Sequence, residues 1–139
     1  MGTVRHVRGV ANRISELRPL SEWAVEVAKT LGCPPDRCFD VDLCLNEAVS
    51  NVIRHGYADG EPHEIRVELA REPEALVILI EDDARPFDPL RAAVTLAASL
   101  DEAGPAGRGI VLLRSASDSA SYERREGRNR LTLKFSIHG

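Results

Sequence analysis

The sequence predicts an α+β domain, a two-layer α/β sandwich in which helices cover one face of a mostly antiparallel mixed sheet. Two observations predict this class. Apolar periodicities give the order strand, helix, helix, strand, strand, loop, helix, strand, strand, and strands that follow one another directly favour antiparallel pairing. The 139 residues contain no repeat or linker and are enough for one sizeable core. We therefore expect a single domain, 1–139.

The N-terminal part of the chain predicts a strand followed by a helix. Val4 to Val10 alternates weakly between apolar and polar residues, as an opening strand would. Apolar residues then recur at helical spacing from Ile14 to Leu31. Pro19 is expected near the start of this helix, where a missing N–H does little harm. Gly32 and the pair Pro34-Pro35 are expected to end it.

The second predicted helix carries a stripe of three polar residues. It should span about 35–57, with Asp36 as its N-cap. Glu47, Asn51 and His55 follow one another at four-residue steps, so they stack on one side of a helix. Such a row could hold a cation and activate a hydroxyl, although surface helices also produce such rows by chance. The core-facing arc consists of Val41, Leu45, Ala48, Val49, Val52 and Ile53.

Four later stretches predict strands. Glu64 to Ala70 alternates cleanly and predicts a strand with one buried face. Ala75 to Ile80 is a continuous apolar run, which is typical of a central strand covered on both sides. Leu131 to Ile137 alternates again. Glu126 to Asn129 has the composition of a hairpin turn, which would join it to a strand over Ser119 to Arg124.

Composition and charge argue against several classes of partner. A formal net charge of −4 provides no basic field, so we expect no nucleic-acid partner. No segment approaches the roughly 20 apolar residues that span a bilayer, and no signal-peptide run opens the chain, so we expect no membrane partner. Cys33, Cys38 and Cys44 lack the spacing of a zinc site. Free thiols in a reducing compartment fit them better, which favours a cytoplasmic protein.

Three consecutive acids directly follow the predicted central strand. Glu81, Asp82 and Asp83 resist joint burial, so this strand end either opens to solvent or meets a ligand. A carboxylate held there can accept a hydrogen bond from an exocyclic amine such as that of adenine. The stiff turn from Ala84 to Pro89 contains Phe87, which we interpret as a core plug rather than a stacking platform.

A pair of glycines precedes the last predicted helix. Gly107 and Gly109 would let backbone N–H groups approach a phosphate at the start of a short helix that ends near Ala116. Arg108 would add a charge-assisted contact or lie in solvent. The Ala-rich stretch from Leu90 to Ala106 is predicted to be a mobile flap or a poorly fixed helix. Neither a P-loop nor a dinucleotide fingerprint is present.

Together these motifs resemble the ATPase domain of gyrase-type topoisomerases, heat-shock chaperones, sensor histidine kinases and mismatch repair proteins. The resemblance is greatest to the free-standing bacterial anti-sigma-factor serine kinases. Asn46 to Tyr57 matches their N box, and Asp82 to Pro89 matches their first glycine box. Gly107 to Leu112 matches the second glycine box, and Tyr122 to Leu133 the terminal hairpin. The resemblance implies a Bergerat-type ATP-binding fold.

The resemblance also implies residue roles, with ATP and Mg²⁺ as cofactors. Asn51 would coordinate Mg²⁺ between the phosphates, Glu47 would accept the proton of the attacking serine hydroxyl, and Asp82 would bind the adenine amine. His55 would lie near the phosphates, and the segment 90–106 would form a lid. The implied nucleotide-binding set is Asn51, His55, Asp82, Ala84, Arg85, Phe87, Gly107, Arg108, Gly109 and Asn129.

Two residues depart from the family pattern. Ala84 stands where the family usually has Gly, and alanine is strained if φ there is positive. Asn129 stands where a Thr often lies near adenine, and Asn can also form a hydrogen bond.

The implied function is an ATP-dependent protein serine/threonine kinase that acts as an anti-sigma factor or a similar partner-switching regulator. It would phosphorylate a small anti-sigma-factor antagonist, with a sigma factor and a second copy of the chain as further expected partners. The alternative is a catalytically weak, nucleotide-responsive module that sequesters a partner, and Ala84 is the residue that motivates it.

Overall fold

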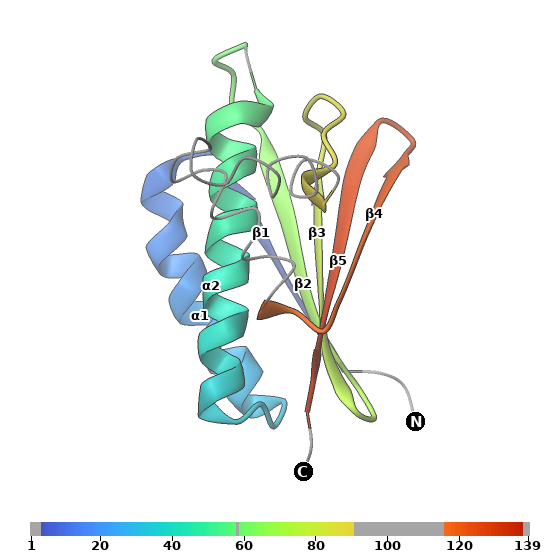
Figure 1. Ribbon diagram of the computed structural model, residues 1–139. Helices are drawn as coiled ribbons and strands as arrows, with labels where there is room; N and C mark the ends of the chain where they lie inside the picture. The colour runs from blue at the N-terminus through green and yellow to red at the C-terminus, as the bar shows by residue number, and fades with distance from the viewer. Residues whose placement is uncertain (1–3, 58, 91–115, 138–139) are drawn as a thin grey trace, which may run out of the picture.

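The computed structural model describes residues 4–57, 59–90 and 116–137 and confirms the α+β sandwich (Figure 1). Predictions for the lid and for Gly107, Arg108, Gly109 and the short helix after them lie outside the described residues. The elements in chain order are β1 (Arg5–Ala11), a 3₁₀ turn (Ile14–Glu16), α1 (Leu17–Thr30), α2 (Pro35–Asn51), a π-helical turn (Val52–Gly56), β2 (Glu64–Glu72), β3 (Ala75–Asp82), β4 (Ser119–Arg125) and β5 (Arg128–Ser136).

The five strands form one sheet in the order β1-β2-β3-β5-β4, and each neighbouring pair is antiparallel. A mixed sheet was expected, but the described strands include no parallel pair. The reason lies in the connections: β2 and β3 form one tight hairpin, β4 and β5 form another, and hairpins are antiparallel by construction.

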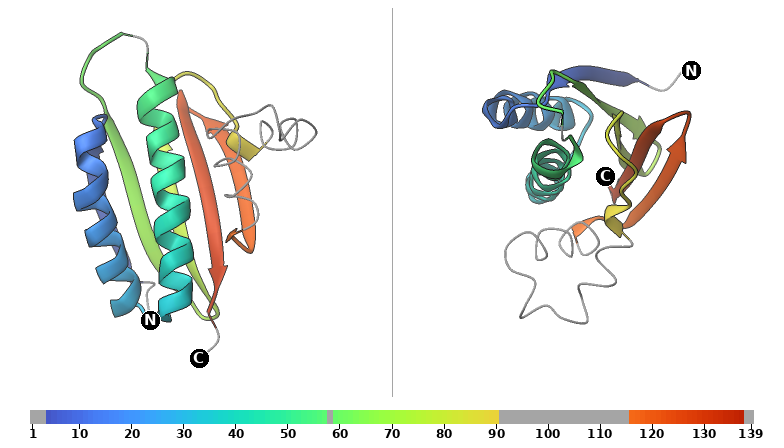
Figure 2. Two further views of the ribbon diagram at one scale, coloured as in Figure 1. Left: turned by 60° about the vertical axis from the view of Figure 1, so that its left-hand side comes forward. Right: turned by 90° about the horizontal axis from the view of Figure 1, so that it is seen from above.

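Helices α1 and α2 lie side by side on one face of the sheet, as predicted (Figure 2). Side chains at alternate strand positions meet the apolar arcs of both helices and form the core. On the strands the core consists mainly of Ile65, Val67, Leu69, Leu76, Ile78, Ile80, Leu131, Leu133 and Phe135, and on the helices of Leu20, Ala24, Val41, Leu45 and Val49.

The other face of the central strand is not covered by the described residues, contrary to the prediction from its apolar run. Val77 and Leu79 on β3 are only partly buried, whereas Leu76 and Ile78 are fully buried. Both described helices pack on the same face, so the opposite face keeps a hollow of about 420 Å³. Charged side chains of neighbouring strands, such as Arg130, line it and shield the apolar residues from part of the solvent.

The second helix begins two residues earlier than an Asp36 cap requires. Pro34 is the N-cap, with ψ of 159°, and Pro35 is the first helical residue. The prediction for Asp36 was wrong because a residue followed by proline is forced into extended backbone, which places the boundary between the two prolines. Asp36 lies instead in the first turn, where a carboxylate favours the helix dipole.

The terminal hairpin turns over two residues rather than four. Glu126 and Gly127 have φ of 53° and 77°, and Arg125 pairs directly with Arg128. Positive φ at both central residues is the geometry that matches the twist of a two-residue hairpin. Asn129 therefore belongs to β5, where it pairs with Asp82 across from β3.

The structure describes all three cysteines and both long helices. All three cysteines are free and buried. Burial raises the pKa of both Cys33 and Cys44 to about 12, so neither thiol ionises readily. Within the described ranges, no helix has the length and apolar character required to cross a bilayer.

Candidate nucleotide-binding site

The α2 helix ends in an amide that has no partner. Asn51 is 8% exposed, and its buried Nδ2 forms no hydrogen bond with another residue in the ranges that the structure describes. A buried polar atom without a partner is costly, and it commonly marks the place of an absent ion or water. Rotation of the amide exchanges its nitrogen and oxygen, so Asn51 can offer an oxygen ligand at this position.

This amide fits the Mg²⁺ that the motifs imply. Mg²⁺ prefers oxygen ligands and takes several of them from substrate phosphates. The described part of the chain holds no group of three or more His, Cys, Asp or Glu that could bind a metal by itself. An ion here would therefore depend on Asn51 together with phosphate oxygens.

Glu47 lies one turn before Asn51 on the same helix. Its side chain is partly buried, and it forms no hydrogen bond or ion pair with another described residue. A carboxylate that is fixed by a helix yet unpaired can accept a proton from a substrate hydroxyl. The geometry is thus compatible with the general-base role.

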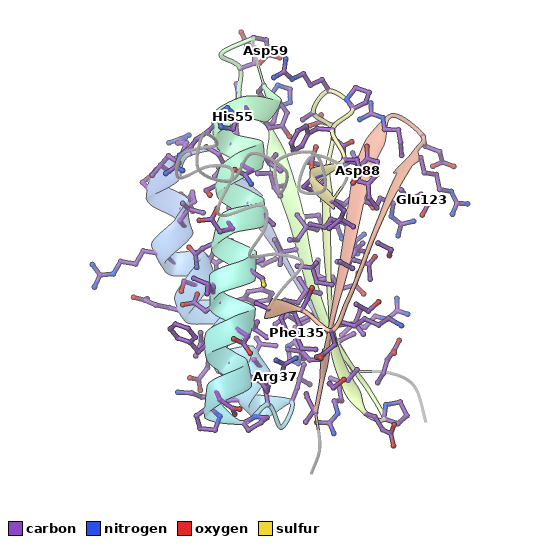
Figure 3. All side chains as sticks on the ribbon, viewed as in Figure 1. Arg37, His55, Asp59, Asp88, Glu123 and Phe135 are labelled. Carbon is purple, nitrogen blue, oxygen red and sulfur yellow. The ribbon has the colours of Figure 1, made fainter. Side chains whose placement is uncertain are left out.

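His55 does not continue the stripe as an α-helical step. The residues from Val52 to Gly56 form a π-helical turn. Such a turn has more residues than an α-helical turn, so a four-residue step there no longer stacks side chains as it does in an α-helix. His55 is exposed at the end of the helix (Figure 3). The predicted three-residue row is therefore a two-residue row.

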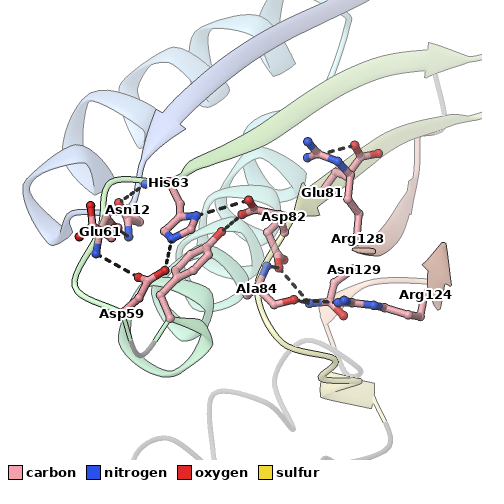
Figure 4. Close-up of polar contacts among 12 residues, drawn as sticks. Asn12, Asp59, Glu61, His63, Glu81, Asp82, Ala84, Arg124, Arg128 and Asn129 are labelled. Atoms are coloured by element: carbon pink, nitrogen blue, oxygen red, sulfur yellow. Dashed lines mark hydrogen bonds and ion pairs between the residues drawn. The ribbon is translucent and has the colours of Figure 1, made fainter. Parts of the chain in front are cut away.

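Asp82 ends β3 as a buried carboxylate that is 4% exposed. Its Oδ1 accepts hydrogen bonds from the Ala84 backbone N–H at 3.0 Å and from Asn129 Nδ2 at 2.9 Å (Figure 4). Its Oδ2 has no partner among the described residues. Burial raises the pKa of Asp82, and the two hydrogen bonds oppose that rise.

The turn after Asp82, residues 82–87, is bound to its surroundings through backbone atoms. Arg124 of β4 donates from Nη1 to the Ala84 carbonyl at 2.8 Å. Asn129 Nδ2 donates to the Arg85 carbonyl at 2.9 Å, and Asn129 Oδ1 accepts the Phe87 N–H at 3.2 Å. Side chains of the β4–β5 hairpin, Arg124 and Asn129, therefore hold the 82–87 turn in place by hydrogen bonds.

Ala84 does not have the strained backbone that its replacement of glycine suggested. Glu126 has the only positive φ of a non-glycine residue in the described ranges, so Ala84 carries no such cost. Ala84 is buried against the end of the α2 helix: a Cβ on Gly56 would lie 2.8 Å from its Cβ. The Arg85 N–H also points to the Gly56 carbonyl, at 3.4 Å.

Phe87 is not a core plug. Its side chain is 43% exposed, and the apolar anchor of this turn is Leu90, which is 7% exposed and belongs to the core. The earlier interpretation failed because the turn runs past the buried end of β3 before the chain re-enters the core. Phe87 and the exposed Arg85 are both open to contact with a ligand.

The structure also joins residues that the sequence analysis did not select. His63 lies between two carboxylates, with Nε2 2.8 Å from Asp59 and Nδ1 3.3 Å from Asp83. The Tyr57 hydroxyl donates to Asp83 at 2.9 Å, and its ring stacks on His63 with centroids 4.1 Å apart. We call Tyr57, Asp59, His63 and Asp83 the His63 clasp (Figure 4).

The pKa values within the His63 clasp shift in mutually consistent directions. The hydrogen bond to Asp59 raises the pKa of His63. The Glu61 N–H and His63 lower the pKa of Asp59. Partial burial works against ionisation of Asp83, but hydrogen bonds from Tyr57 and His63 outweigh it and lower its pKa. In the sequence, Asp59 and His63 are four residues apart, but they lie in a loop, where such spacing does not predict that two side chains meet.

The sequence as a whole matches one family. Residues 10–135 match the family described as the histidine kinase-like ATPase domain. This chain belongs to that family.

Among the relatives of this chain are proteins named as serine kinases and one named an anti-sigma F factor, of Clostridium novyi. The chain is 38% identical to the serine/threonine-protein kinase BtrW of Bordetella bronchiseptica over 96 residues. The aligned region covers 68% of each chain. The chain is 25% identical over 116 residues to the serine-protein kinase RsbW of Bacillus pumilus, covering 78% of this chain and 72% of that one. Within its family the chain thus groups with the anti-sigma-factor serine kinases.

A solved structure supports the fold of this histidine kinase-like ATPase. The crystal structure of the SiaB–SiaC complex from Pseudomonas aeruginosa matches with a TM-score of 0.60 and 19% identity. The match covers 95% of this chain and 89% of that chain.

Proposed function

We propose that this chain is an ATP-dependent protein serine/threonine kinase that acts as an anti-sigma factor or a similar partner-switching regulator and phosphorylates a small antagonist protein. The observation that carries the proposal is Asp82, a buried carboxylate at the end of β3: two donors bind its Oδ1, and its Oδ2 has no partner among the residues that the structure describes. That second oxygen can accept a hydrogen bond from the exocyclic amine of adenine. The similarity to the kinases BtrW and RsbW supports the protein substrate class.

The chemistry assigns separate tasks to the two residues of the α2 stripe. The serine hydroxyl of the antagonist attacks the γ-phosphorus of ATP, the bond to the β-γ bridging oxygen breaks, and ADP leaves. Glu47 accepts the hydroxyl proton. Asn51 would hold Mg²⁺, which when bound neutralises charge on the phosphates. Such transfers depend mainly on positioning, and a helix holds both side chains at a fixed separation.

The direct test separates binding from transfer. Glu47→Ala should retain ATP binding in calorimetric titration but lose phosphorylation of the antagonist by roughly 100-fold or more, because general-base catalysis is removed. Glu26→Ala, at an exposed position on α1, is the matched control and should transfer phosphate normally. Full transfer by Glu47→Ala would exclude Glu47 as the base.

The alternative function, a nucleotide-responsive module without transfer, loses its main motivation in the structure. It was based on strain at Ala84, and Ala84 has no positive φ. Calorimetry with ATP and ADP, combined with an assay for phosphoserine on the antagonist, distinguishes the two functions. Binding without any phosphoserine would favour the alternative.

The finer assignments of partners are also proposals. A sigma factor and a second copy of this chain are the further partners that the resemblance implies, and a cytoplasmic location follows from that role. Light scattering over a range of protein concentrations tests self-association. Co-purification with a candidate sigma factor, with and without ATP, tests the regulatory partner.

A further inference from the structure

Asn129 is a buried side chain whose amide is fully used within the protein. It is 6% exposed. Its Nδ2 donates to Asp82 Oδ1 and to the Arg85 carbonyl, each at 2.9 Å, and its Oδ1 accepts from the Phe87 N–H and the Tyr122 hydroxyl. An amide has two donor hydrogens and two acceptor sites, so no capacity is left for a nucleotide. Direct contact with the base is therefore not the role that this geometry favours.

The same hydrogen bonds orient the carboxylate of Asp82. Asn129 Nδ2 and the Ala84 N–H both donate to Oδ1, so the carboxylate cannot rotate without losing two bonds. This arrangement leaves Oδ2 as the acceptor for a ligand. Adenine presents an amine donor to such an oxygen, whereas guanine presents a carbonyl acceptor at the corresponding position, which a carboxylate repels.

We propose that Asn129 is a positioning residue for base selectivity: it fixes the Asp82 carboxylate and the 82–87 turn so that Asp82 Oδ2 selects adenine over guanine. The inference rests on the proposed ATP-binding function. It replaces the earlier expectation that Asn129 itself binds adenine. The strand register supports it, because the two-residue hairpin turn places Asn129 directly opposite Asp82.

Conversion of the amide to a carboxylate gives a sharp test through pH. In Asn129→Asp the two carboxylates would share one proton at mildly acidic pH, and the shared proton would replace the N–H that Asn129 donates to Asp82. When that proton is lost, two negative charges face each other. We expect ATP affinity near that of the wild type at about pH 5.5 and a loss of roughly tenfold or more towards about pH 8.5.

The control for added charge is Ser119→Asp on β4. Ser119 is exposed and lies away from the 82–87 turn, so the ATP affinity of the Ser119→Asp variant should follow the wild-type pH profile. Asn129→Ala should weaken ATP binding at every pH and lower the preference for ATP over GTP. A wild-type pH profile in Asn129→Asp, or an unchanged ATP-to-GTP preference in Asn129→Ala, would overturn the proposal.

A second measurement needs no nucleotide. Carboxyl-carbon NMR of Asp82 should show a higher pKa in Asn129→Ala than in the wild type, because a hydrogen bond to the ionised form is lost. Far-ultraviolet circular dichroism confirms that the variant is folded. An unchanged Asp82 titration in the folded variant would refute the positioning role. If wild-type protein bound no ATP while the Asp82 titration shifted, the proposed function would fail and the positioning of Asp82 would stand.

Discussion

Two groups of side chains hold the 82–87 turn, and they differ in burial and in charge. On the sheet side, Asn129 is buried, neutral and fully hydrogen-bonded. On the side of the α2 helix, the His63 clasp is partly exposed and consists of ionisable groups. Figure 4 shows the two groups on either side of the turn.

The 82–87 turn is thus held by a neutral side chain, Asn129, and by the His63 clasp, whose ionisable groups respond to pH and salt. The amide of Asn129 does not itself ionise, and its burial shields its hydrogen bonds from salt. Exposed ion pairs are weakened by salt and depend on protonation. We therefore expect the shape of the proposed adenine site to depend mainly on Asn129. The contact of the 57–63 loop with Asp83 should depend on pH and salt concentration.

The largest effect should follow Asn129→Ala. The substitution removes a buried hydrogen bond to Asp82 Oδ1 and partly buried ones to the Arg85 carbonyl and the Phe87 N–H. A buried group left without its partner costs about 1–3 kcal/mol. Urea unfolding should therefore show a loss of about 2–4 kcal/mol in unfolding free energy.

Asn12→Ala is the matched control for this loss. Asn12 also binds a loop through its amide, accepting from the His63 N–H at 2.9 Å and donating to the Glu61 carbonyl at 3.2 Å, but it lies in a more exposed place. Water can replace its bonds, so the cost should be smaller. Equal losses in the two variants would mean that burial does not distinguish the two anchors.

An intermediate effect should follow Gly56→Ala, which tests direct packing between the helix end and the turn. The new Cβ would lie 2.8 Å from the Ala84 Cβ, and overpacking of this kind costs about 1–3 kcal/mol. The second substitution Ala84→Gly should restore most of the loss, which a double-mutant cycle in urea measures. Ala84→Gly alone should slightly destabilise the protein and leave ATP affinity unchanged, because φ is not positive there.

The smallest effect should follow His63→Gln, and it should depend on pH. The raised pKa of His63 means that its contribution is complete below the ordinary histidine pKa of 6.5 and is lost as pH rises through the folded value. The lowered pKa values of Asp59 and Asp83 mean that their contributions are present above 3.8 and are lost on further acidification.

The difference in thermal stability between wild type and His63→Gln should therefore be greatest in mildly acidic buffer at low salt. Thermal melts over a pH series, with and without added salt, measure it. A difference that persists unchanged in alkaline, high-salt buffer would show that packing of the Tyr57 ring on His63, rather than charge, holds the loop.

The two-layer class, the helical cover on one face of the sheet and the α2 face with Glu47 and Asn51 could be predicted from the sequence. These depend on local periodicity, because a residue's face on a strand or helix is set by its position in the repeat. Phe87 shows the limit of this reasoning, because its exposure depends on where Leu90 re-enters the core.

The assembly of the site depends on contacts between segments that are distant in the chain. Asn129 meets Asp82 because a two-residue turn sets the register of β5, and one residue more would have moved Asn129 to the other face. The His63 clasp joins residues of a loop to the end of β3, and the Ala84 side chain fits beside the helix because Gly56 has no Cβ at that contact. Contacts between distant segments follow from packing, which no local pattern in the chain encodes.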